Sequence, residues 1–413
     1  MSEQTVNTSE FRANKDLELG ERVIVRRFNS APQRVVATLG RNENLLALLY
    51  ELRHGGNLTC SDLSQLTGLA SPTVHRLLAT LVQRRLVVED STSRTASGVG
   101  RPASSYHFNR SVVSVAGVDV GAETTRIAIA AADGTIIAYE SLPTAQVVRD
   151  LPTQIGSIID SLMSSVISEA GPLVGVGVGI PGSLNPSTGV VRRAFLHQEL
   201  VGLPIQALLE DRLLCSVVVE KDDHLSVIAE VSDQGTVPDA KTLVVVNYGR
   251  GIGVGVVTDN VVINGAHGQA GRIVHWPSTV PGVTLGDVLP IDALLAAYRA
   301  SGGDHSPVDG MGLCELARTG DPVASEVVGR AGTELAGVFL HLATIFDPEY
   351  MVLGGGFSGS FDLFDQPLQE ALSVLAYPPQ VLATAMGSGA VVVGALLAAD
   401  QFIEKWLRTT VAG

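Results

Sequence analysis

The sequence is poor in cysteine and in long apolar runs. Its 413 residues include three cysteines, Cys60, Cys215 and Cys314, which stand far apart and form no CxxC pair. A disulfide framework or a structural zinc knuckle is therefore not expected, and this cysteine usage is typical of a reducing cytoplasm. No apolar run approaches the roughly 18 residues of a membrane-spanning helix. Because the N-terminus is polar and unlike a signal peptide, we expect a cytoplasmic protein without a membrane segment.

Positive charge is also scarce, since the formal net charge is −14. Taken as a whole, this value argues against a nucleic-acid partner. The distribution reverses the argument: residues 1–110 carry 14 basic and 10 acidic side chains, whereas the remainder carries 14 and 32. A net charge of +4 attached to one of −18 favours a module that contacts a polyanion, joined to a body that does not. Ordinary surface variation is the alternative. The length and the 46% apolar content predict two or three folded domains.

The N-terminal quarter carries the pattern of a helix-turn-helix. Residues 1–33 are polar and predict a flexible arm, and helical periodicity runs from Arg34 to Gly55. A capping box at Thr59 predicts a short second helix that stops at Gly68. Serine as N-cap with proline next predicts a third helix beginning at Ser71. Two short helices joined by a glycine-containing turn, after a longer helix, indicate a helix-turn-helix.

A hairpin wing follows these helices. Leu86–Val88 and Tyr106–Phe108 predict two strands around the polar segment Ser91–Ser105. Residues 34–110 are therefore predicted to form a winged helix-turn-helix that binds double-stranded DNA, and a small protein-interaction domain is the alternative. We expect base contacts from Thr73, His75 and Arg76, phosphate contacts from Ser71 and Arg84, and a minor-groove contact from the wing residues Gly100, Arg101 and Pro102. A plain flexible loop is the alternative for the wing.

The remainder of the chain predicts an α/β body with two related lobes. Strand, glycine turn and strand occur in sequence after Val115 and again after Leu243, and helical stretches follow each set. This weak internal repeat predicts a first lobe over residues 111–238 and a second over 239–413, with a cleft between them. The C-terminal helix is expected to return to the first lobe.

The order of the glycine-rich motifs resembles the ROK family of sugar kinases and transcriptional repressors, over roughly residues 34–400. The markers are Gly117–Gly121, Gly179–Gly182, Val219–Asp222, Gly251–Gly255, Ala270 and Gly271 with His275, Asp347 and Pro348, and Leu353–Gly356, with Gly100–Pro102 in the wing. The resemblance implies a winged helix followed by an actin/hexokinase-like, ribonuclease-H-like ROK body. It is greatest for the repressor branch, typified by xylose and N-acetylglucosamine repressors.

Departures from the kinase pattern predict loss of phosphate transfer. Where the resemblance implies glycine and threonine in the first phosphate turn, this chain has Ala122 and Glu123, and Arg250 replaces the threonine of the second turn. A carboxylate about 4 Å from a phosphate is repulsive by about 1–4 kcal/mol. The resemblance places a catalytic base at Asp222, which could still accept a hydrogen bond from a sugar hydroxyl. An ordinary charged residue at a strand end is the alternative.

The same resemblance implies an effector site between the lobes, with Gly182, Glu199, Asp222, Arg272 and His275 as the candidate residues; a histidine that only packs in the fold is the alternative for His275. Arg272 replaces a sugar-binding glutamate, and this change favours a phosphate, a carboxylate or an acidic sugar over a neutral hexose. The cysteine cluster that accompanies the histidine in zinc-binding members is absent, so we expect no metal and no cofactor.

Three hypotheses follow. The first is a ROK transcriptional regulator, usually a repressor, that lacks kinase activity and senses a sugar, sugar phosphate or sugar acid. It would act as a homodimer or homotetramer, because two readers match two half-sites of an operator. The second is a sugar kinase that carries a DNA-binding domain. The third is a regulator with no small-molecule effector.

Overall fold

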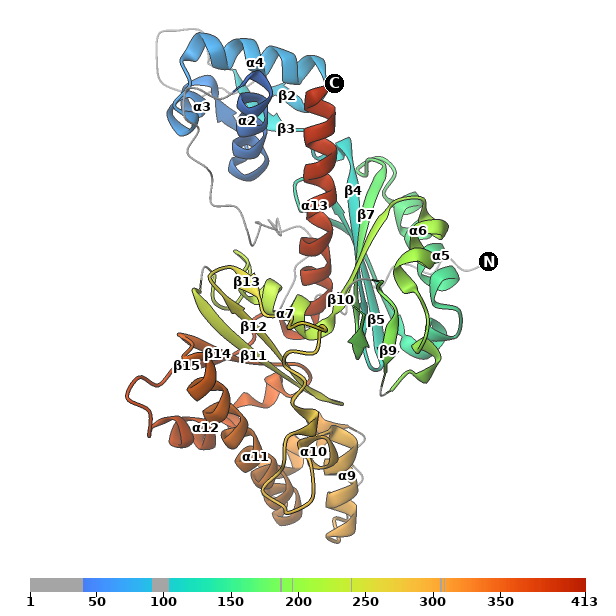
Figure 1. Cartoon of the computed structure of the whole chain (residues 1–413), viewed down its shortest axis with the longest axis vertical. Coiled ribbons are helices and arrows are strands. Elements are labelled where there is room, and N and C mark those ends of the chain that lie inside the picture. Colours follow the sequence, from blue (N-terminus) through green and yellow to red (C-terminus); the bar gives the residue numbers. More distant parts are fainter. Residues whose placement is uncertain are drawn as a thin grey trace.

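The computed structural model describes residues 40–90, 104–185, 188–194, 196–238, 240–304, 307 and 309–413. The described chain forms an N-terminal module and two sheet-centred lobes, connected by one long C-terminal helix (Figure 1). The predicted arm and the wing residues Gly100, Arg101 and Pro102 lie outside the described residues. Within the described part, no helix combines the length and the apolar character needed to cross a membrane.

The N-terminal module has the winged-helix arrangement that the sequence predicted. Its elements are α2 (Arg41–Gly55), β1 (Leu58–Thr59), α3 (Cys60–Thr67), α4 (Ser71–Gln83), β2 (Val87–Asp90) and β3 (Ser105–Phe108). The three strands form a sheet in the order β1-β3-β2. The capping box is confirmed, since the Asp62 amide donates to the Thr59 hydroxyl and the Asp62 carboxylate accepts from the Thr59 amide.

The predicted N-cap of the third helix is wrong by one residue. Ala70 is the N-cap of α4, and Ser71 is already helical with Pro72 in the first turn. Proline still begins the helix, because its fixed φ suits the first turn and its missing N–H costs no intrahelical bond there. The Ser71 hydroxyl is instead 3.6 Å from the Cys60 sulfur, where it joins the start of α4 to the start of α3.

The first lobe is a five-stranded mixed sheet in the order β10-β7-β4-β5-β6. Its strands are β4 (Ser114–Val120), β5 (Thr124–Ala131), β6 (Ile136–Pro143), β7 (Leu173–Ile180) and β10 (Ser216–Lys221). Helices α5 (Leu151–Ser165) and α6 (Ile205–Leu213) pack on the sheet, and a small ribbon is formed by β8 (Ser183–Leu184) and β9 (Val191–Arg193).

The second lobe repeats this topology. Its sheet has the order β13-β12-β11-β14-β15, formed by β11 (Thr242–Tyr248), β12 (Ile252–Thr258), β13 (Val261–Val262), β14 (Tyr350–Gly354) and β15 (Gln380–Ala383). In both sheets the first strand is central, the next two follow as antiparallel neighbours, and the last two add in parallel on its other side. The internal repeat in the sequence therefore corresponds to two lobes with the same topology.

Helices complete the second lobe and the junction between the lobes. The outer helices are α8 (Leu285–Val288), α9 (Ile291–Ala300), α10 (Gly310–Arg318), α11 (Pro322–Phe346) and α12 (Asp365–Leu372). Two further helices, α7 (Asp222–Glu230) and α13 (Ala390–Ala412), pack against each other; α7 also lies on β12, and α13 lies on β4 and β7. From this junction α13 extends to the N-terminal module (Figure 1).

Glycines in β4 and β7 explain how closely α13 approaches the first sheet. Gly117 and Gly177 are paired across these strands. A Cβ at Gly177 would lie 2.0 Å from the Ala395 carbonyl oxygen, and one at Gly117 would lie 2.6 Å from that of Val392. Part of the glycine pattern that resembles a phosphate-binding motif therefore serves helix packing, because any side chain here would displace α13.

Candidate functional site

The face of α4 predicted to read DNA is available for contact. Val74, Leu77, Leu78 and Leu81 are buried, and their helical spacing places them on one side of α4. His75 and Arg76 are exposed on the opposite side, together with Ser71, whereas Thr73 is half-buried. This division leaves the N-terminal half of α4 with one cation and one imidazole directed to solvent, as insertion into a major groove requires.

Arg84, predicted to contact phosphate, is already engaged by the body. Its guanidinium donates to the carbonyl oxygens of Thr410 (2.7 Å) and Val411 (2.9 Å), at the C-terminal end of α13. A cation is favourable at this position, because the last carbonyls of a helix have no intrahelical partner and carry partial negative charge. The geometry therefore favours a role for Arg84 in docking the N-terminal module in place of the expected phosphate contact.

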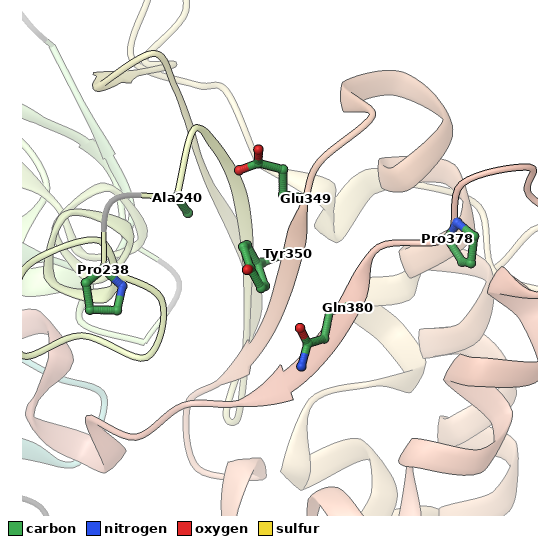
Figure 2. A pocket seen from close by; sticks show the side chains of 6 residues that line it. All are labelled: Pro238, Ala240, Glu349, Tyr350, Pro378 and Gln380. Atoms are coloured by element: carbon green, nitrogen blue, oxygen red, sulfur yellow. The ribbon is translucent and has the colours of Figure 1, made fainter.

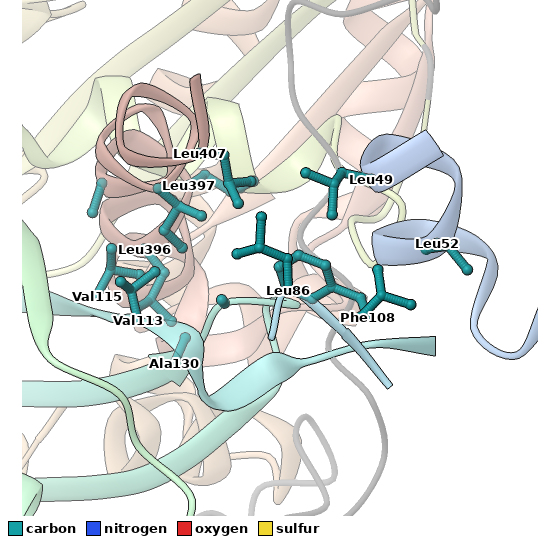
Figure 3. Packing of buried hydrophobic residues seen from close by; sticks show 14 of the residues in the cluster. Leu49, Leu52, Leu86, Phe108, Val113, Val115, Ala130, Leu396, Leu397 and Leu407 are labelled. Carbon is teal, nitrogen blue, oxygen red and sulfur yellow. The ribbon is translucent and has the colours of Figure 1, made fainter. Parts of the chain in front are cut away.

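The N-terminal module and α13 share one apolar core. A single cluster includes Leu86 and Phe108 of the module and Leu407 of α13, and it continues to Val115 of β4 (Figure 3). Because these side chains are withdrawn from water together, any movement of the module relative to α13 would expose apolar surface. The module is therefore packed onto the body and is not connected to it only by a flexible linker.

A buried ion pair joins the same two parts. Arg53 of α2 donates to both carboxylate oxygens of Asp400 on α13, and its Nε donates to the Ala132 carbonyl oxygen at 2.5 Å. The two charged side chains are 4% and 5% exposed. Burial acts to lower the pKa of Arg53, but Asp400 outweighs this effect and raises it. Sequence reasoning missed this pair, because 347 residues separate its members.

An ion pair lies beside the first glycine turn, which connects β4 and β5. Asp119, at the end of β4, is buried and accepts a hydrogen bond from Arg126 on the neighbouring strand, at 3.3 Å. Burial raises the pKa of Asp119 to about 6, although Arg126 acts in the opposite direction. Sequence reasoning did not single out Arg126, whose place opposite Asp119 is set by the hairpin register.

The two residues that depart from the kinase pattern in the phosphate turns bind each other. Glu123, which follows β4, accepts from Arg250 Nε at 2.6 Å and from its Nη2 at 2.5 Å. Arg250 Nη1 also lies 3.1 Å from Asp292 of α9. Residues 123 and 250 belong to equivalent strand-turn-strand segments of the two lobes, so this ion pair connects the lobes. We refer to Glu123, Arg250 and Asp292 as the interlobe ion cluster.

Asp222 lies at the start of α7, beside a second carboxylate that the sequence did not single out. Asp223 is buried, 2.7 Å from Lys221 Nζ and 3.0 Å from the Asn247 side-chain nitrogen. Lys221 and this hydrogen bond outweigh burial and lower the pKa of Asp223. Asp222 is half-buried, and burial together with Asp223 raises its pKa well above the ordinary value. Asp222 therefore binds protons more tightly than its neighbour.

Two glycines of β12 leave room for the start of α7, which carries these two carboxylates. A Cβ at Gly253 would lie 2.2 Å from the Asp223 carboxylate, and one at Gly255 would lie 2.2 Å from the Asp223 carbonyl oxygen. The absence of side chains at both positions lets the start of α7 lie directly on β12. In the motif Gly251–Gly255, these two glycines therefore allow close packing of α7.

Of the predicted effector residues, Arg272 and Gly182 come together. The Arg272 guanidinium donates to the hydroxyl of Ser183, the residue after Gly182, and Asp222 and Asp223 act on its charge. Gly182 has φ +139°, and a Cβ there would lie 2.2 Å from the Arg193 carbonyl oxygen. Two further predicted residues are exposed: Glu199 lies in the 3₁₀ turn Gln198–Leu200, and His275 ends the turn Ile273–His275.

The cavity in Figure 2 lies away from these residues. It has a volume of about 420 Å³ and is lined by Pro238, Ala240, Glu349, Tyr350, Pro378 and Gln380. Its one carboxylate, Glu349, already accepts a hydrogen bond from the Lys241 amide at 2.9 Å. Among the described residues, no group of three or more histidine, cysteine, aspartate or glutamate side chains is arranged to hold a metal ion.

Comparison with known sequences links both parts of the chain to described families. The sequence model of the ROK family matches residues 115–401, and that of the IclR helix-turn-helix domain matches residues 43–91. The xylose repressor of Caldicellulosiruptor bescii is 22% identical, over 83% of this chain and 90% of its own length. The repressor Mlc of Escherichia coli is 21% identical over 84% and 90%, and a glucokinase of Halalkalibacterium halodurans is 24% identical over 63% and 86%.

Solved structures likewise include a regulator that matches most of this chain and a kinase that matches a smaller share of it. The crystal structure of a ROK family transcriptional regulator, described as a homologue of E. coli Mlc, matches with a TM-score of 0.70 and 21% identity, over 91% of this chain and 100% of that chain. A ROK family glucokinase from Streptomyces griseus, in complex with glucose and AMPPNP, matches with a TM-score of 0.59 and 23% identity, over 70% and 99%. At these identities the likeness shows the fold alone.

Proposed function

This chain belongs to the ROK family, and from that premise we propose that it is a DNA-binding transcriptional regulator, a repressor, that senses a sugar or sugar-derived molecule and lacks kinase activity. The observation that carries the proposal is the winged-helix module before the ROK body, with His75 and Arg76 exposed on α4. The repressor relatives extend over this module, whereas the glucokinase covers a smaller share of the chain.

The interlobe ion cluster supports the absence of kinase activity. Arg250 binds Glu123 and Asp292, so its charge is compensated within the protein. A triphosphate in the first turn would meet the Glu123 carboxylate, and it would have to displace this carboxylate from Arg250. The fold of the body is retained although its turns no longer suit a nucleotide. This combination favours a body that senses a ligand and mediates assembly.

We infer that DNA binding requires a symmetric assembly in the cytoplasm. A single α4 reads one half-site, and two copies related by a two-fold axis would place two helices in successive major grooves of a palindromic operator. A homodimer meets this need, and a homotetramer would allow two operators to be joined. A ligand bound between the lobes would change DNA affinity if it favoured one spacing of the two modules.

The full-length protein should select a specific duplex from a random-sequence DNA pool. The selected sequence is expected to contain an inverted repeat whose half-sites are about one helical turn, or a multiple of it, apart. A gel-shift titration at fixed salt should then show tighter binding to the selected duplex than to a shuffled one by at least about a thousandfold. Equal affinity for both duplexes would overturn the assignment of a specific regulator.

Kinase activity is the second candidate function, because glucokinases are among the relatives and Asp222 is retained at the position of the base. We expect no ADP formation above the protein-free rate when the full-length protein is incubated with ATP, magnesium and a panel of hexoses. Asp222→Asn should behave identically. Turnover by the natural sequence that is lost in Asp222→Asn would contradict the proposal and identify a kinase.

A further inference from the structure

Two arginines lie beside one serine at the lobe interface, one through strand pairing and the other through a hydrogen bond. Arg193 of β9 is paired in register with Ser183 of β8, so their side chains start from directly opposed backbone positions, about 5 Å apart at the Cβ atoms. Arg272, which comes from the second lobe, donates to the Ser183 hydroxyl. That hydroxyl donates in turn to the Gln269 side-chain oxygen at 2.7 Å, which holds it in place.

Two glycines with positive φ fix the backbone near both arginines. The φ of +139° at Gly182 brings the chain against the Arg193 carbonyl oxygen, where any Cβ would clash. Gly271, with φ +77°, lies so close to the Val254 carbonyl oxygen that a Cβ would be 1.8 Å away. Only glycine tolerates both the positive φ and the close carbonyl contact. Gly182 and Gly271 therefore fix the backbone positions from which the side chains of Arg193 and Arg272 extend.

The electrostatics of this point are unusual for the body, whose residues 111–413 have a net charge of −18. Burial and the like charge of Arg193 lower the pKa of Arg272, so Arg193 is the charge that acts on it most strongly. Arg193 is exposed and forms no ion pair with any described residue. Of the two carboxylates that act on Arg272, those of Asp222 and Asp223, the second is compensated by Lys221.

We propose that Arg193 and Arg272 form an anion-binding site at the lobe interface, and that the effector is a hydroxylated carboxylate or phosphate ester. This inference rests on the proposed function, since it names the ligand class of the sensing site. The guanidinium groups bind the anionic end of the ligand, and Asp222, which also acts on Arg272, accepts a hydrogen bond from a ligand hydroxyl.

The chemistry of the side chains separates this ligand class from neutral sugars. A guanidinium has five N–H donors and no acceptor, and its fork matches the paired oxygens of a carboxylate or phosphate. Two adjacent cations repel each other until an anion lies between them, so an anion gains affinity that a neutral hexose cannot. Because Arg193 belongs to the first lobe and Arg272 to the second, the anion would also connect the lobes.

The test is calorimetric titration of the full-length protein with D-gluconate, glucose 6-phosphate and glucose. Either anionic probe should bind more tightly than glucose, and comparing the carboxylate with the phosphate identifies the source of the charge. Arg193→Gln should weaken anion binding at least about tenfold, as expected for one charge-assisted hydrogen bond. The matched control is Arg192→Gln, an exposed arginine one residue earlier on the same strand, which should leave affinity unchanged.

Failure of this inference can be distinguished from failure of the proposed function. Glucose binding as tightly as the anions, no binding of either anion at millimolar concentration, or equal losses in Arg192→Gln and Arg193→Gln would each overturn the anion site. Arg193→Gln should retain affinity for the DNA duplex selected by the natural sequence. If the natural sequence binds anions but selects no duplex, the regulator assignment fails while the anion site stands.

Discussion

Replacing Arg53 by alanine should lower the free energy of unfolding by about 3–5 kcal/mol, the usual cost of breaking a buried ion pair by removing one partner. Asp400, 5% exposed, would keep its charge without the guanidinium that compensates it, and the Ala132 carbonyl oxygen would lose its donor. Chemical denaturation monitored by circular dichroism measures this change. Because Arg53 joins α2 to α13, the module should also separate from the body at lower denaturant concentration than in the natural protein.

The matched control is Arg110→Ala. Arg110 pairs with Glu169 at 2.7 Å, but their side chains are 42% and 48% exposed, so the loss should be at most about 1 kcal/mol. The double variant Arg53→Met, Asp400→Leu removes both charges and should recover most of the stability lost in Arg53→Ala. A loss in Arg53→Ala no larger than in Arg110→Ala would contradict the role given to the buried pair.

Arg76→Ala should reduce affinity for the selected operator by about 10–100-fold, because a base-reading arginine contributes about 1–3 kcal/mol of discrimination. Arg76 is exposed and lies opposite the buried stripe of α4, so thermal stability should not change. Gel-shift titration at constant salt measures the affinity, and a melting curve for each variant tests the folding. Arg101→Ala is expected to act in the same direction, through the minor groove.

Gln83→Ala is the control on the same helix. Gln83 is exposed at the last residue of α4, two turns beyond Arg76, so its removal should leave operator affinity within about twofold. If Arg76→Ala and Arg101→Ala both keep the natural affinity, the proposed reading residues are wrong even if DNA binding itself is confirmed. If Gln83→Ala weakens binding as much as Arg76→Ala, the reading face extends along the whole helix.

Local patterns predicted most of the architecture. The strand, glycine turn and strand expected after Val115 appear as β4 and β5, and those expected after Leu243 appear as β11 and β12. These elements are long and strongly patterned, so apolar periodicity and glycine turns define them. The N-cap of α4 was wrong because Ser-Pro is compatible with two starting positions, and the contact between Ser71 and Cys60 comes from packing that the local pattern does not contain.

The site was less predictable, because its decisive contacts join distant segments. The sequence identified Glu123 and Arg250 as two separate departures from a nucleotide site, and it predicted that the Glu123 carboxylate repels phosphate. The structure pairs them across 127 residues. Similarly, the motif Val219–Asp222 pointed to Asp222, whereas Asp223 is the carboxylate bound by Lys221 and Asn247.

By itself, the sequence determined the kind of protein: a winged-helix module on a two-lobed ROK body, with charge of opposite sign on the two parts. These properties follow from short-range periodicity and motif order, which need no knowledge of distant contacts. Only the tertiary structure decided what several charged residues do. Arg84 binds the end of α13, Arg53 is buried with Asp400, and Arg250 is neutralised by Glu123. The physical reason is that the partner and the burial of a charge determine its role, and both are set by chain segments far apart in sequence.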